Sequence, residues 1–78
     1  MKRDMDLIRE ILLEIESWKP GSPGKTITIQ GRSYDTVKDH VLLLLDAGLI
    51  DLQPNVDRDL LIVSRLTWAG HEFLGAAR

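Results

Sequence analysis

The chain has 78 residues, of which 44% are hydrophobic, and it contains no cysteine. This length allows one domain, residues 1–78, with little room for a deep catalytic cleft beside its core, so we expect neither an enzyme nor a bound cofactor. The formal net charge of −2 lowers the expectation of nucleic-acid binding, because such binding draws much of its affinity from basic residues.

The same composition bears on where the protein resides. Without cysteine the chain forms no disulfide or thiolate zinc site, which fits a reducing cytoplasm. No apolar stretch follows the charged start of the chain, so no signal peptide is expected. The longest apolar run, Val41–Leu45, is too short to cross a bilayer, so we expect no membrane partner.

Residues 4–18 are predicted to form the first helix. Its apolar residues recur at helical spacing and form one stripe, which consists of Ile8, Ile11, Leu12 and Ile15. Asp4 stands where it can cap the first turn, and Pro20 ends the helix because proline cannot continue it. The following segment, Lys19–Lys25, is expected to be a connecting loop. It lacks the Walker spacing that a phosphate-binding loop requires.

The next two elements are a short strand and a second helix. Residues 26–30 alternate strictly between polar residues and isoleucine, which predicts a strand with both isoleucines facing the core. Residues 33–47 are predicted to form a helix with Ser33 as its N-cap and Gly48 just beyond its end. Its buried stripe is expected to consist of Val37, Val41, Leu44 and Leu45.

The remaining residues predict a hairpin and a closing helix. Two strands, residues 49–53 and 60–66, are expected to pair around a polar turn at 54–59. Thr67 is a suitable N-cap for a helix over 68–77, in which Phe73 and Leu74 contact the core and Gly70 allows close packing. The whole order is helix, strand, helix, two strands and helix. This is the order of an α+β winged helix whose short middle helix is reduced or missing.

Three segments carry a resemblance to a known family. They are the opening MKRDMDLIREIL, the segment from His40 to Ile50, and the run LTWAGHEFL over residues 66–74. Together they resemble the bacterial and prophage family named for domain of unknown function 2513, over nearly the whole chain. The resemblance implies a winged helix in a bacterial or phage setting. It implies no catalytic residue.

A winged helix usually reads DNA with the outward face of its second helix and with the hairpin, or wing. We therefore expect a DNA-binding or regulatory module, even though the basic residues are scattered along the sequence. The candidate nucleic-acid contacts are Arg32, Ser33, Tyr34, Thr36, Lys38, His40, Arg58 and Arg65.

The alternative is a phage-type module that binds a protein, either a host protein that it inhibits or a second copy of itself. With Val37, Val41 and Leu44 facing inward, helical geometry predicts an outward face of Asp35, Asp39, Leu43 and Asp46. Carboxylates on such a face repel phosphates. The continuous apolar run at 41–45 also exceeds what a lone surface helix needs. The candidate partner contacts are Asp35, Asp39, Leu42, Leu43 and Asp46.

Histidine and tryptophan offer two further interpretations. His40 and His71 lie on different predicted helices without metal-ligand spacing, so we expect no metal site. Trp18 and Trp68 are either ligand platforms or covers over the open end of a small core, and we favour covers. Tyr34 either contacts a phosphate or holds the second helix against the strand.

Overall fold

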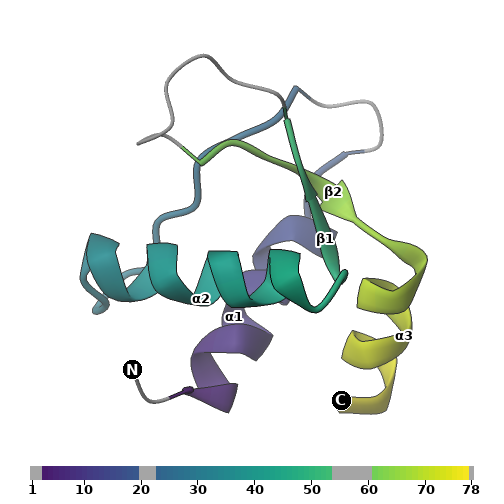
Figure 1. Ribbon diagram of the computed structural model, residues 1–78, viewed down its shortest axis with the longest axis horizontal. Helices are drawn as coiled ribbons and strands as arrows, with labels where there is room; N and C mark the ends of the chain where they lie inside the picture. Colours follow the sequence, from purple (N-terminus) through teal and green to yellow (C-terminus); the bar gives the residue numbers. More distant parts are fainter. Residues whose placement is uncertain (1–2, 20–22, 54–60, 78) are drawn as a thin grey trace.

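A computed structural model describes residues 3–19, 23–53 and 61–77 (Figure 1). Within these ranges three helices accompany a two-stranded antiparallel sheet, so the fold is a small α+β arrangement. The elements in chain order are α1 (Met5–Glu16), α2 (Tyr34–Asp46), β1 (Ile50–Leu52), β2 (Val63–Leu66) and α3 (Trp68–Ala77). Figure 1 shows α2 crossing in front of α1, the hairpin rising from the end of α2, and α3 at the side.

Helix α1 is the central element, and it contacts α2, β2 and α3. The carboxylate of Asp4 caps it by accepting from the backbone N–H groups of Asp6 and Leu7. The predicted apolar stripe is confirmed, with Leu7 added to it. The helix ends at Glu16, earlier than predicted, where the Ser17 hydroxyl donates to the Glu14 carbonyl oxygen at 2.6 Å and competes with the helical pattern.

The predicted strand at 26–30 is wrong as a strand. Only Lys25 pairs with the sheet, through two backbone hydrogen bonds with Val63 of 3.0 and 2.8 Å. The chain then continues without regular structure, although Ile27 is buried and Ile29 is half-buried. Alternation therefore predicted the inward isoleucines correctly. It could not predict the ladder, because a strand also needs a neighbour in register.

Helix α2 confirms the predicted second helix. The Ser33 hydroxyl accepts from the Thr36 N–H, and Gly48 follows the helix with a φ of 76°, in the left-handed region that glycine adopts at little cost. Leu45, which we expected in the buried stripe, is instead 38% exposed. The buried side of α2 instead includes His40, which is 1% exposed.

Strands β1 and β2 form the predicted antiparallel hairpin. Ile50 pairs with Leu66, Asp51 with Arg65 and Leu52 with Val63. Because Ser64 has no opposite residue, the ladder carries a bulge between Asp51 and Leu52. The predicted turn at 54–59 lies outside the described residues.

Helix α3 begins as predicted at a Thr67 cap. The Thr67 hydroxyl accepts from the Gly70 N–H at 3.0 Å and donates to the Gly48 carbonyl oxygen at 2.6 Å, which ties α3 to the end of α2. Leu74 is fully buried and Phe73 is half-buried, as expected. Gly70 lies against the backbone of Leu49, where an added Cβ would collide with the carbonyl oxygen.

The core gathers residues from all three helices and from the sheet. Its buried hydrophobic members are Leu7, Ile8, Ile11, Leu12, Ile15, Ile27, Val37, Val41, Leu44, Ile50, Val63, Leu66 and Leu74. Trp18 packs against this core as a cover, with the Lys25 ammonium 5.4 Å from its ring centroid. The same prediction is wrong for Trp68, whose side chain is 81% exposed.

Gly70→Ala is expected to lower the free energy of unfolding by about 1–3 kcal/mol, the usual cost of overpacking, because the new methyl group meets the Leu49 carbonyl. Urea denaturation monitored by circular dichroism measures the change. Gly75→Ala is the matched control on the same helix. Its Cβ enters open space, so alanine should stabilise the protein by up to about 1 kcal/mol. Equal effects at the two positions would contradict the close contact at Gly70.

Candidate functional site

The exposed side of α2 carries three carboxylates around a leucine. Asp35, Asp39, Leu42 and Asp46 follow one another at intervals of three or four residues, so they share one side of the helix. All four are exposed, and Leu42 is 42% exposed. We call these four residues the acidic face. It contains four of the five side chains predicted to contact a protein partner.

Leu43, the fifth predicted partner contact, does not lie at the centre of this face. It is half-buried and lines a hollow of about 330 Å³ together with Met5, Ile8 and Phe73. The hollow therefore lies where α1, α2 and α3 meet. The buried side of α2, which includes His40, leaves Leu42 pointing to solvent and Leu43 pointing toward α1 and α3.

Two of the basic residues predicted to contact nucleic acid form ion pairs with carboxylates of the same chain. The guanidinium of Arg32 pairs with the Asp4 carboxylate at 2.7 Å, and that of Arg65 pairs with the Asp51 carboxylate at 2.9 Å. Lys38 is half-buried and lines a small hollow with Tyr34, whose side chain is 47% exposed. Arg58, which was also predicted to contact nucleic acid, lies outside the described residues.

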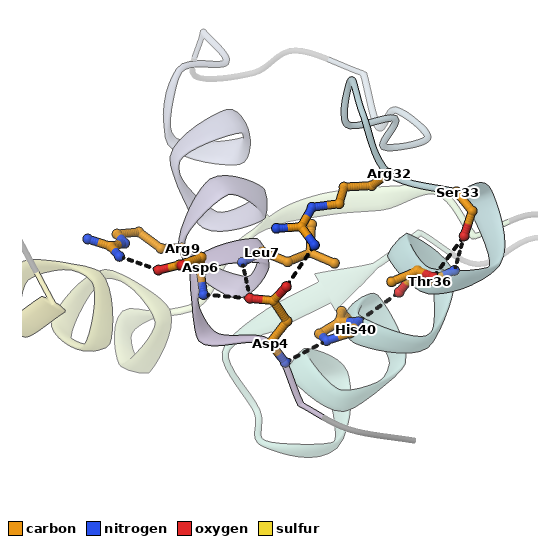
Figure 2. A network of polar contacts seen from close by, with 8 residues as sticks. All are labelled: Asp4, Asp6, Leu7, Arg9, Arg32, Ser33, Thr36 and His40. Atoms are coloured by element: carbon orange, nitrogen blue, oxygen red, sulfur yellow. Dashed lines mark hydrogen bonds and ion pairs between the residues drawn. The ribbon is translucent and has the colours of Figure 1, made fainter.

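Ser33, Thr36 and His40 belong to a polar network that joins the start of α2 to the start of α1 (Figure 2). The Ser33 hydroxyl donates to the Thr36 hydroxyl at 2.7 Å and accepts from the Thr36 N–H at 3.2 Å. The Asp4 N–H donates to Nε2 of His40 at 2.9 Å, and Nδ1 of His40 lies 2.7 Å from the Thr36 carbonyl oxygen.

These partners fix the protonation of the His40 ring. A carbonyl oxygen can only accept, so Nδ1 carries the proton, and a backbone N–H can only donate, so Nε2 carries none. The ring is therefore neutral and buried, and both of its nitrogens have hydrogen-bond partners inside the fold. The prediction that His40 contacts a groove is wrong in this structure. The signal was available, because His40 lies three residues after Val37 and four before Leu44, in line with the buried stripe.

Asp4 is the other centre of the network. Its carboxylate accepts from the Leu7 N–H, and this bond is the main reason that the pKa of Asp4 lies below its ordinary value. The ion pair with Arg32 and the bond from the Asp6 N–H lower the pKa further, and partial desolvation opposes them. Each of these contacts favours the ionised carboxylate, so the network is strongest when Asp4 is charged.

Two other kinds of site are absent from the residues that the structure describes. In these ranges no three histidine, aspartate or glutamate side chains gather closely enough to hold a metal ion. None of the helices in the described ranges combines the length and apolarity needed to span a membrane.

Asp4→Ala is expected to lower the free energy of unfolding at neutral pH, because it removes two cap bonds and the Arg32 ion pair. The folded-state pKa of Asp4 is lowered, so its stabilisation exists at neutral pH and disappears as the pH falls through that value. Asp4→Asn keeps a cap acceptor and should lose less. Urea denaturation across the acid range measures both variants. A gap between wild type and Asp4→Ala that stayed constant with pH would contradict this assignment.

His40→Leu should lower the free energy of unfolding by about 1–3 kcal/mol, because the Asp4 N–H loses its acceptor. Amide hydrogen exchange at Asp4 should accelerate at the same time. His71→Leu is the matched control, since His71 is exposed on α3, and its effect should stay within about 0.5 kcal/mol. Unchanged exchange at Asp4 in His40→Leu would show that the bond is not formed.

Comparison with known proteins agrees with the resemblance that the sequence carries. The model of the family described as "Hypothetical protein (DUF2513)" matches residues 2–78. An uncharacterized protein of Haemophilus influenzae is 40% identical over 82 residues, which cover 100% of this chain and 69% of the relative. No solved structure matches the chain. The chain belongs to the DUF2513 family.

Proposed function

We propose that this chain is a winged-helix module that binds a protein partner through the acidic face of α2. The observation that carries the proposal is the contrast between the two kinds of charge. Three aspartates surround an exposed leucine on one helix face, while Arg32 and Arg65 are paired with carboxylates of the same chain. An accessible acidic surface with an apolar centre suits a partner of opposite charge.

The partner that fits is a basic protein surface with an apolar side chain at its centre. Such a surface would place lysine or arginine opposite Asp35, Asp39 and Asp46 and bury Leu42. Charge would guide the encounter and fix the orientation, while burial of the leucine would add affinity. Surfaces that receive nucleic acid have this basic chemistry, so an inhibitor that occupies such a surface is consistent with the face.

The winged-helix part of the proposal is supported by the order of the elements. Helix α2 leads through Gly48 directly into the hairpin, and α3 follows the hairpin without a loop. Lys25 pairs with Val63, which also pairs with Leu52 of β1. Three chain segments thus meet at one level of the sheet. A winged helix would have its first strand in the position that Lys25 occupies.

DNA binding is the second candidate, and the position of α2 favours it. In a winged helix the element that precedes the hairpin enters the major groove. Tyr34 and Lys38 lie in the N-terminal half of α2 and could face such a groove with Arg32 beside them. Against this, Asp35 and Asp39 occupy the same half of the helix and would meet the phosphates.

Leu42→Glu is expected to abolish capture of the protein partner while leaving the fold intact. Immobilised wild type and variant would be compared with a bacterial lysate, and bound proteins would be quantified by mass spectrometry. Leu13→Glu is the matched control, because Leu13 on α1 has the same 42% exposure and lies on another helix. Partners lost with Leu42→Glu and kept with Leu13→Glu support the proposal. Equal effects of the two variants contradict it.

A salt titration with a random 20-base-pair duplex separates the two candidates. Electrostatic attraction to DNA is greatest at low salt, so a DNA-binding module must bind there. We expect no measurable binding even at low salt. Binding that weakens with added salt and disappears in Lys38→Glu would favour DNA over the protein partner.

A further inference from the structure

Helix α3 presents a second exposed face, on the side opposite the core. Its members are Trp68, His71, Glu72, Gly75 and Ala76, and together they line a shallow hollow of about 470 Å³. We call these residues the α3 face. Trp68 stands at one end of it, and the small residues Gly75 and Ala76 lie two helical turns away at the other end.

The exposure of Trp68 is imposed by the fold. Residues two positions apart on a helix point in nearly opposite directions, and Gly70 lies against the backbone of Leu49. The Thr67 cap and the buried Leu74 hold the same rotation of α3. Trp68 cannot therefore turn inward without breaking these contacts. An indole that is 81% exposed leaves a large apolar surface in water.

We propose that the α3 face binds the α3 face of a second copy of this chain. In a two-fold symmetric pair each residue contacts its counterpart reciprocally, so the face must complement itself. With the two α3 helices antiparallel, the register that sets Trp68 opposite Gly75 of the second copy also sets His71 opposite Glu72. Each indole then enters the space beside a glycine, and each histidine meets a carboxylate. One register satisfies both shape and hydrogen bonding.

The dimer uses one helix face per chain, so it buries less surface than a stable interface of standard size. It is therefore weak and depends on protein concentration. The acidic face lies on α2, and neither proposal depends on the other, so dimer formation and partner capture can fail separately.

The test combines sedimentation velocity with tryptophan fluorescence, from low micromolar to millimolar protein. Trp18→Phe leaves Trp68 as the only tryptophan, and its emission should shift to the blue as the dimer forms, because the ring leaves water. Gly75→Gln fills the space that receives the indole and should raise the dimer dissociation constant at least about tenfold. A Cβ added at this position meets nothing within 4 Å in the monomer, and glutamine favours the helix more than glycine does.

Ala69→Gln is the matched control, since it adds the same side chain to an exposed position of α3 that does not line the hollow. It should leave the dissociation constant unchanged. A chain that stays monomeric throughout, with unshifted Trp68 emission, overturns the proposal. A dimer that forms with unshifted emission, or one that Gly75→Gln leaves intact, overturns it as well, because another surface then makes the contact.

Discussion

The buried side of α2, where His40 lies among three hydrophobic core residues, determines which residues this protein can offer to a partner. Its ring fills the inward side of α2 between Val37 and Leu44, and it joins that helix to the N–H of Asp4 at the start of α1. Together with the buried Val37, Val41 and Leu44, His40 sets the rotation of α2. Leu42 and the three aspartates then face solvent, and Leu43 faces α1 and α3. A single neutral imidazole thus couples the core to the acidic face.

The polar network between α1 and α2 also holds polar and charged side chains in fixed positions. Arg32, which could have contacted a phosphate, is held by the carboxylate that caps α1. The Ser33 hydroxyl caps the first turn of α2 by accepting from the Thr36 N–H, and it donates to the Thr36 hydroxyl. Groups that a DNA-binding helix would present to a groove are therefore used to close the fold. We favour a protein partner for this reason, although the order of the elements is one that DNA-binding proteins share.

Much of the architecture could be predicted because local signals agree with tertiary packing. Asp4, Ser33 and Thr67 cap the three helices as expected, and the hairpin pairs as expected. The predictions are wrong where a contact between residues far apart in the sequence decides the local structure. Residues 26–30 have strand character, but only Lys25 finds a neighbour in the sheet. Trp68 has the chemistry of a core residue, but the contact of Gly70 with Leu49 turns it outward.

One spectrum tests whether His40 is a buried neutral ring with its proton on Nδ1. A long-range ¹H–¹⁵N correlation spectrum of the histidine side chains at neutral pH distinguishes a protonated ring nitrogen from a bare one. We expect a protonated Nδ1 and an unprotonated Nε2 for His40, with exposed His71 as the internal reference. A proton on Nε2, or on both nitrogens, would contradict this expectation, because the Asp4 N–H would then have no acceptor on the ring.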